Sequence, residues 1–300
     1  MQFGGVLVAA ITPRRPTGHE IDIGATLEVI DFLSASGASG IALLGSTGEF
    51  LHFDFEDRIR LAALSVKRSR VPILLNISHS TLDGSLKLAR EAIGAGVAGL
   101  LLMPPYYFRY DQATVREYFF RYARELGQRS QTLLYNIPFF TTELTSATSC
   151  ELLGTGLFGG IKDSSGKLDY LEALRAQRAQ TPFSLLIGND TIFTRGRSTG
   201  ADGVVSGVAC ALPELMLALD RAITGGQLDR INRLETRLQE FIRQIDRLPT
   251  PIGVREAVAL RGVKIGPHAT PLGPPGDQVL AEFREWFKGW LPELKKEAHA

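Results

Sequence analysis

The chain has 300 residues, of which 44% are hydrophobic and 22% charged, and its 33 basic and 32 acidic residues leave a formal net charge of +1. This is an ordinary globular composition, and a charge balance near zero gives no reason to expect a nucleic acid or an anionic membrane as partner. No apolar run approaches the roughly 18 residues of a membrane-spanning helix, and the N-terminal stretch lacks the pattern of a secretory signal peptide.

Short apolar runs recur along the chain, and each is followed by a stretch whose apolar residues have helical spacing. Runs of this kind, rich in β-branched residues and leucine, are typical of strands buried on both faces. We expect strands at Gly5–Ile11, Gly40–Leu44, Val71–Ile77, Gly99–Met103, Thr132–Asn136, Phe158–Ile161, Phe183–Ile187 and Gly203–Val205.

The alternation of strands and helices requires a parallel sheet that is covered by helices. An open doubly wound sheet would satisfy this alternation as well. The count of eight strands, followed by a change to helix alone, favours an α/β fold with a closed (β/α)8 TIM barrel over residues 1–224.

The pattern changes after Val208. We expect helices over Pro213–Ile223, Leu228–Leu248, Gly253–Leu260 and Asp277–Trp290. Prolines break the chain between them, at positions 249, 251, 267, 271, 274 and 275. Because no low-complexity linker precedes this part, we expect residues 225–300 to form a helical extension packed on the barrel.

The two cysteines, Cys150 and Cys210, have no CxxC spacing. This argues against a disulfide scaffold and against a zinc ribbon. We therefore expect two reduced thiols in a cytoplasmic protein.

Reactive side chains of a (β/α)8 barrel lie where strands end and loops begin. Lysine is scarce, with 8 residues against 25 arginines, and Lys162 directly follows the sixth apolar run. Burial of an ammonium group lowers its pKa, and the free amine can attack a ketone to form an imine. The alternative is a lysine that pairs with Asp163 at the strand end.

Tyr135 lies near the end of the fifth strand, so it can share a site with Lys162 and pass protons to and from a carbinolamine. The alternative is a core tyrosine.

The second strand ends in GSTGE at residues 45–49. Two glycines around two hydroxyl residues expose backbone N–H groups that suit a carboxylate, although an ordinary turn that caps the next helix would look the same.

Tyr106 and Tyr107 follow Pro104 and Pro105 after the fourth strand. With Phe108 and Tyr110 they form either an aromatic interface patch or a segment that reaches into the site of a neighbouring subunit.

Six motifs fall on predicted strand ends: GSTGE at 45–49, PPYY at 104–107, YNIP at 135–138, GIKDSSG at 160–166, GND at 188–190 and GADGVVSG at 200–207. In this order and spacing the chain resembles the dihydrodipicolinate synthase / N-acetylneuraminate lyase superfamily of class I, Schiff-base-forming pyruvate aldolases. The resemblance spans nearly the whole chain.

The resemblance implies that Lys162 forms the imine with a 2-oxo acid and that Tyr135 is the general acid and base. Ser46 would hold the proton-relay position, and Tyr107 would extend the relay across a dimer interface.

The resemblance further implies that Thr47 and the surrounding backbone, Gly48 included, bind the substrate carboxylate. Val205 would border the pyruvate pocket. It also implies a homotetramer built as a dimer of dimers that needs no metal or organic cofactor.

One position departs from the synthase branch of the superfamily. Where that branch has an arginine that binds the carboxylate of the second substrate, this chain has Phe140, preceded by Phe139. A phenylalanine cannot pair with a carboxylate. Arg109 or Arg195 could compensate; otherwise the pocket is less polar and suits an aldehyde or a sugar acid.

The sequence therefore predicts a pyruvate-dependent aldolase or lyase that acts on an aldehyde or sugar-acid partner. Three alternatives stay open: a dihydrodipicolinate synthase with a displaced carboxylate site, a deoxy-sugar-acid dehydratase, and a barrel that binds a 2-oxo acid without turnover.

Overall fold

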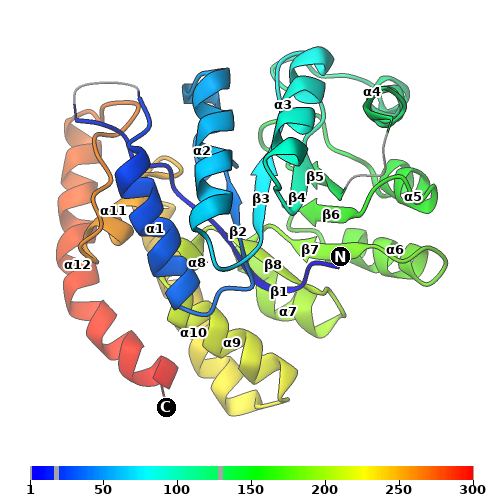
Figure 1. Cartoon of the computed structure of the whole chain (residues 1–300). Coiled ribbons are helices and arrows are strands. Elements are labelled where there is room, and N and C mark those ends of the chain that lie inside the picture. The colour runs from blue at the N-terminus through cyan, green and yellow to red at the C-terminus, as the bar shows by residue number, and fades with distance from the viewer. Residues whose placement is uncertain (1, 17–19, 128–130, 300) are drawn as a thin grey trace.

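The structure is a computed structural model that describes residues 2–16, 20–127 and 131–299. Eight parallel strands pair in chain order, and β8 pairs with β1, so the sheet closes (Figure 1). The strands are β1 (Gly5–Ala9), β2 (Gly40–Leu43), β3 (Ile73–Asn76), β4 (Gly99–Leu102), β5 (Thr132–Asn136), β6 (Gly160–Asp163), β7 (Ser184–Ile187) and β8 (Gly203–Ser206). The TIM barrel expected from the sequence is confirmed.

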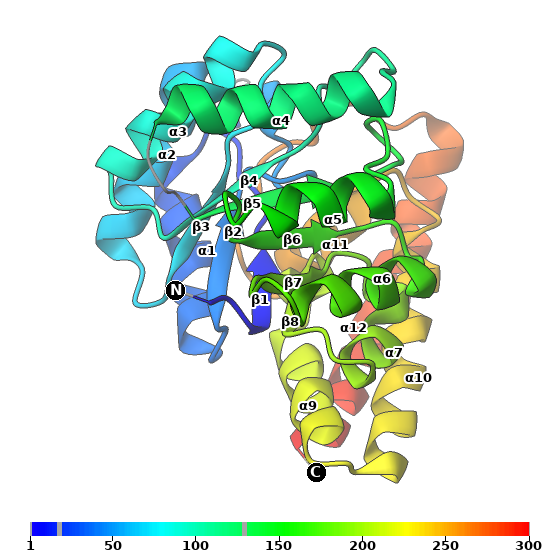
Figure 2. The same ribbon diagram turned by 90° about the vertical axis from the view of Figure 1, so that its right-hand side faces the viewer.

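Helices that follow the strands form the outer ring of the barrel (Figures 1 and 2). They are α1 (Ile23–Ala35), α2 (Phe55–Arg68), α3 (Leu82–Gly94), α4 (Gln112–Leu126), α5 (Ser146–Gly154), α6 (Leu168–Arg178), α7 (Phe193–Ser198), α8 (Val208–Ala211) and α9 (Pro213–Thr224), with short 3-10 turns η1 (Phe50–His52) and η2 (Asp190–Ile192). Asp22, Thr81, Asp111 and Thr145 cap α1, α3, α4 and α5, because their side chains accept hydrogen bonds from first-turn N–H groups.

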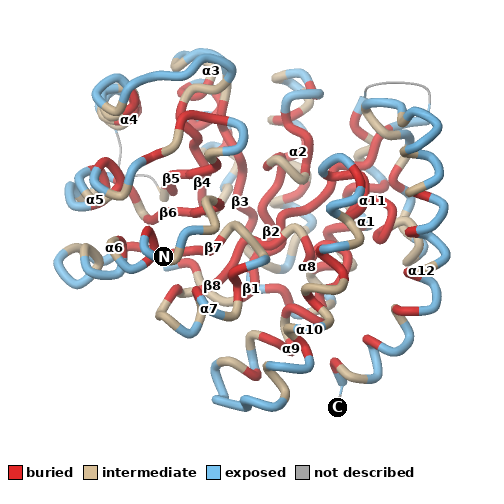
Figure 3. Tube along the Cα trace, turned by 180° about the vertical axis from the view of Figure 1, so that it is seen from behind, coloured by how far each residue is buried: buried red, intermediate tan, exposed pale blue. Residues whose placement is uncertain are grey.

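Burial follows the two-faced environment that the apolar runs predicted. Every strand residue except Gly5 is buried, whereas the outer faces of the helices are exposed (Figure 3). Such strands carry side chains alternately toward the barrel interior and toward the helices, so both faces must be apolar.

The sixth strand differs from its predicted boundaries. It runs from Gly160 to Asp163 and not from Phe158 to Ile161, so Lys162 lies inside β6 and does not follow it. The apolar pattern ends before the strand does because the last residues of a barrel strand face the mouth, where polar side chains are needed.

Three further helices follow the barrel: α10 (Leu228–Ile245), α11 (Ile252–Ala259) and α12 (Pro274–His299). The prediction that Pro274 and Pro275 break the chain was wrong. They open α12, where the absence of an N–H group costs no hydrogen bond, and the helix continues past Trp290 to His299.

Aromatic side chains join α12 to the rest of the molecule. The Phe241 ring of α10 lies 5.9 Å from the Phe287 and Trp290 rings of α12, measured between centroids. Stacked and tilted rings at this distance add to the apolar area that is buried. Helix α12 also contacts α9 and α11.

Two searches of the described residues bear on partners. No helix there combines the length and the apolarity needed to cross a bilayer. The same residues contain no group of three His, Cys, Asp or Glu side chains arranged to hold a metal ion.

Candidate active site

Lys162 and Tyr135 lie opposite each other on β6 and β5, in register, and both side chains line one cavity. Lys162 Nζ is 4.0 Å from the centroid of the Tyr135 ring. Tyr135 is fully buried and Lys162 is 3% exposed. None of the ion pairs found in the described part of the chain involves Lys162, so the alternative of a pair with Asp163 is not supported.

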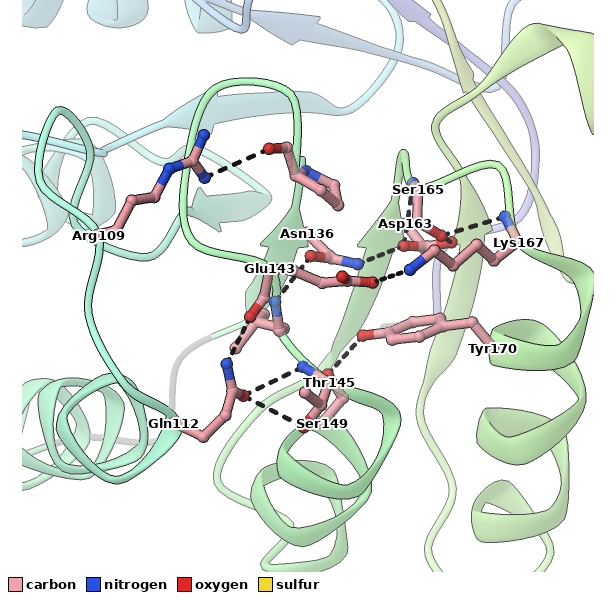
Figure 4. A network of polar contacts seen from close by, with 12 residues as sticks. Arg109, Gln112, Asn136, Glu143, Thr145, Ser149, Asp163, Ser165, Lys167 and Tyr170 are labelled. Carbon is pink, nitrogen blue, oxygen red and sulfur yellow. Dashed lines mark hydrogen bonds and ion pairs between the residues drawn. The ribbon is translucent and has the colours of Figure 1, made fainter.

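Asp163 points the other way, because neighbouring side chains of a strand face opposite sides. Its Oδ1 accepts a hydrogen bond of 2.7 Å from Asn136 Nδ2, and its Oδ2 accepts one of 2.7 Å from the Ser165 hydroxyl (Figure 4). Asn136 Oδ1 in turn accepts from the Leu144 N–H at 3.0 Å. Burial raises the pKa of Asp163. These contacts tie the ends of β5 and β6 together directly behind the Tyr135 and Lys162 side chains.

Ser46 approaches the same pair from the loop after β2. The Ser46 hydroxyl is 3.2 Å from the Tyr135 hydroxyl, and either oxygen can donate. Thr47 lines the cavity next to Ser46. The structure therefore brings Ser46, Thr47, Tyr135 and Lys162 together, as the sequence predicted.

Gly48 does not line the cavity but shapes the turn that carries Ser46 and Thr47. A Cβ atom at Gly48 would lie 2.8 Å from the Leu44 nitrogen, closer than packing allows. The turn is held at both ends: Asn76 Nδ2 donates to the Leu44 carbonyl, and the Thr12 hydroxyl donates to the Gly48 carbonyl, each at 2.8 Å.

The cavity has a volume of about 630 Å³ and two kinds of wall. Strand ends and the loops that follow them supply the first wall, which includes Ala9, Ser46, Thr47, Tyr135, Lys162 and Val205. The loop after β5 and the segment of α10 and α11 supply the second wall, which includes Ile137, Phe139, Phe140, Ile242, Ile245, Asp246 and Val254. Phe139 and Phe140 are 73% and 55% exposed, so they lie at the opening.

Lys162 is the only basic residue among those that line the cavity in the described structure. Arg109 is turned away and donates to the carbonyls of Pro138 and Thr141, and Arg195 is exposed on α7. Neither arginine lines the cavity, so neither compensates for the neutral Phe140.

Sequence reasoning missed Asp190, which lines the cavity after β7. Its Oδ2 accepts from the Val208 N–H at 3.2 Å, and burial raises its pKa. The GND motif at 188–190 includes Asp190 and falls on a predicted strand end, but the sequence suggested no role for this residue. Gly188 leaves room for the lysine, because a Cβ there would lie 2.9 Å from Lys162 Cε.

Sequence reasoning also missed the contribution of α10 and α11. Ile242, Ile245 and Val254 follow the spacing of core residues, and nothing in that spacing distinguishes a cavity wall from a packed interface.

Tyr107 stands apart from the other predicted site residues. It is 87% exposed, has a φ of 78° and packs edge-on against Phe108. It does not line the cavity of its own chain. Its role in a relay across a subunit interface stays a prediction.

Comparisons with known proteins give one family. The profile of the dihydrodipicolinate synthetase family matches residues 2–288. A 4-hydroxy-tetrahydrodipicolinate synthase from Methanothrix thermoacetophila is 30% identical over 286 residues, which cover 94% of this chain and 95% of that protein.

Two solved structures have the same fold. The Escherichia coli K12 prophage protein YagE, solved with pyruvate, is 27% identical, with a TM-score of 0.86 over 98% of this chain and 99% of that one. The sialic acid aldolase of Ruminococcus gnavus is 22% identical, with a TM-score of 0.87 over 97% and 99% of the two chains, and supports the fold alone.

Proposed function

The chain belongs to the dihydrodipicolinate synthetase family, and on that premise we propose that Lys162 forms an imine with pyruvate and that a C–C bond to an aldehyde is then made or cleaved. The family resemblance expected from the motifs is confirmed, and the protein is a lyase of the class I aldolase type. The observation that carries the proposal is the buried Lys162 amine beside the Tyr135 ring, in a cavity that also contains the Ser46 and Thr47 loop.

The chemistry follows from these positions. Lys162 Nζ attacks the keto carbon of pyruvate, water leaves, and the resulting iminium nitrogen draws electrons from the neighbouring C–H bond to give an enamine. The enamine carbon then attacks the aldehyde; the reverse sequence cleaves the bond. Tyr135 and Ser46, whose hydroxyl groups are 3.2 Å apart, pass the protons that both directions require. Thr47 and its backbone hold the pyruvate carboxylate.

The residues of the second wall favour a second substrate that is an aldehyde without a carboxylate group. Once Lys162 is consumed in the imine, none of the described lining residues is basic, whereas Asp190 and Asp246 are acidic. Phe140 presents an apolar edge. A substrate carboxylate placed there would lose its water without gaining a partner, which costs several kcal/mol.

A second candidate is 4-hydroxy-tetrahydrodipicolinate synthase, which the 30% identical relative favours. That activity needs a second substrate, aspartate semialdehyde, that carries its own carboxylate. The absence of a basic partner at the second wall argues against it. Dehydration of a deoxy-sugar acid would use the same imine and stays a third candidate.

The test is reductive trapping. Pyruvate with borohydride should add a fixed mass to the peptide that contains Lys162. Recovery of the unmodified peptide alone would contradict the proposed imine, both for an aldolase and for a barrel that binds pyruvate as an imine without turnover. A panel of neutral aldehydes, sugar-derived aldehydes and aspartate semialdehyde should then show turnover with neutral members and little with aspartate semialdehyde.

We also propose that the protein works in the cytoplasm as a homotetramer, a dimer of dimers in which Tyr107 reaches the site of a neighbour. The exposed aromatic side chains of Tyr107, Phe108 and Tyr110 support a subunit contact at this place. Sedimentation of the purified protein tests it: a monomer at micromolar concentration with full activity would contradict it.

A further inference from the structure

The loop that presents Ser46 and Thr47 begins and ends in a strained backbone conformation. Leu44 and Glu49 have φ angles of 56° and 54°, in the left-handed region that residues with a Cβ rarely occupy. Such residues persist only where the surroundings hold them. The hydrogen bonds from Asn76 and Thr12 hold the backbone of this loop, but neither of them involves the Glu49 side chain.

The Glu49 carboxylate is turned away from the cavity and into a buried cluster of charges. Glu49 Oε2 accepts a hydrogen bond of 2.9 Å from Arg255 Nη1, and Glu49 Oε1 lies 3.7 Å from Arg14 Nη2. Arg14 and Arg255 are 2% and 0% exposed. The carboxylate thus joins the last residue of the GSTGE loop to two buried cations.

Arg255 fixes this cluster to the C-terminal part of the chain. It lies on α11, which packs between α8 and α12 (Figure 1). Besides Glu49, its guanidinium donates to the carbonyls of Thr12 at 2.9 Å, Ile265 at 2.7 Å and Pro267 at 3.2 Å. Because each of these acceptors is at a fixed place in the backbone, the guanidinium has one orientation and so does the carboxylate that it binds.

We propose that Glu49 and Arg255 are positioning residues that set the place of Ser46 and Thr47, so that helix α11 controls how well the barrel binds the carboxylate of its 2-oxo acid. The inference rests on the proposed function. Neither side chain lines the cavity, so both act through the loop and not on the substrate.

A buried ion pair gives little net stability compared with an apolar pair, but the loss of one partner leaves the other charge without compensation. In Glu49→Gln the amide oxygen can still accept a hydrogen bond from Arg255, but the negative charge is lost and the amide NH₂ faces the Arg14 guanidinium. The anchor of the loop is then weaker, and the strained backbone at Glu49 can relax. Thr47 and Ser46 would then move relative to Lys162 and Tyr135.

The test is the Glu49→Gln variant in the full-length protein, with trapping by borohydride measured over a range of pyruvate concentrations. We expect the half-saturating concentration of pyruvate to rise at least tenfold. Thermal unfolding is measured on the same samples, since a loss of stability alone would not change the half-saturating concentration of the folded fraction.

Glu214 offers a matched control. Arg261, just after α11, donates to Glu214 Oε1 at 2.6 Å and to the Ala211 carbonyl at 2.9 Å, and neither side chain lines the cavity. Glu214→Gln also removes the carboxylate from a largely buried arginine. We expect it to lower the melting temperature while leaving the half-saturating pyruvate concentration within twofold of wild type.

If Glu49→Gln does not fold, the Glu49→Asp variant tests the positioning role of Glu49 instead. It keeps the charge but is one methylene shorter, so it reaches Arg255 only if the loop shifts, and the half-saturating concentration should rise at least threefold. Wild-type half-saturation in folded Glu49→Gln, or in Glu49→Asp, would overturn the inference. Failure of the wild-type protein to trap pyruvate would instead overturn the proposed function.

Discussion

The two walls of the cavity are built in different ways. Strand ends supply the first wall, where Lys162 and Tyr135 are fixed by the register of β6 on β5 and by the Asn136–Asp163 hydrogen bond behind them. The second wall comes from a loop after β5 and from helices near the end of the chain, and it contains Phe140 and Asp246. Under the proposed function, the first wall determines which reaction occurs and the second wall determines which partner is accepted.

The largest effect should come from removing the nucleophile of the first wall. Lys162→Ala should abolish trapping and lower turnover by about 10⁴-fold or more, because no second amine is among the described residues that line the cavity. Its melting temperature should stay within a few degrees of wild type, because no ion pair between described residues includes Lys162 and its removal therefore leaves no opposite charge unpaired. Turnover assays and calorimetry check both points, and loss of folding would assign Lys162 a structural role.

Tyr135→Phe should have the next largest effect. It removes the hydroxyl that contacts Ser46 but keeps the ring beside Lys162. We expect turnover to fall by about 10²–10³-fold, while pyruvate capture is spared far better than in Lys162→Ala. Steady-state kinetics and trapping should be run in parallel; an equal loss of both would mean that Tyr135 serves packing and not proton transfer.

Asp163→Asn examines the support behind the first wall. One of the two carboxylate oxygens becomes an NH₂ group, from which the Ser165 hydroxyl can accept by turning, but the hydrogen bonds from Asn136 and Ser165 are no longer strengthened by a negative charge. The free energy of unfolding should fall by about 1–3 kcal/mol, measured by denaturant titration. Ser165→Ala removes only the half-buried partner and should cost less. If the two variants cost the same, the Asn136 contact is not the important one.

Phe140→Arg tests the second wall, with the smallest change in rate. A guanidinium at the opening should improve turnover of carboxylate-bearing aldehydes by about tenfold relative to neutral ones, without changing pyruvate trapping. Phe140→Leu controls for the loss of the ring. An unchanged preference in both variants would show that aldehyde selection lies elsewhere in the cavity.

The sequence predicted the first wall much better than the second. Lys162, Tyr135 and Ser46 lie at the ends of apolar runs, and a closed barrel brings strand ends together at one mouth, so a linear pattern is enough to place them. The predicted end of β6 was wrong because the apolar run stops at the first charged side chain, Lys162, whereas the strand continues to Asp163.

The second wall has no such linear signal. Ile242, Ile245 and Asp246 lie at the end of one amphipathic helix, and which of its faces meets the cavity depends on how α10 packs on the barrel. Asp190 lies in a recognised motif, but only the structure shows that its side chain lines the cavity. The strained, ion-paired Glu49 likewise depends on a contact with Arg255, 206 positions away.

Helices α10 and α11 supply part of the second wall and the anchor of Glu49, and this has a consequence for synthesis. A chain emerging from the ribosome presents its N-terminal residues first. All eight strands are made before Ile242, Val254 and Arg255. The proposed nucleophile Lys162 is thus synthesised before Ile242, Val254 and Arg255, and the lining of the cavity and the anchor of Glu49 are complete only once residue 255 has been added.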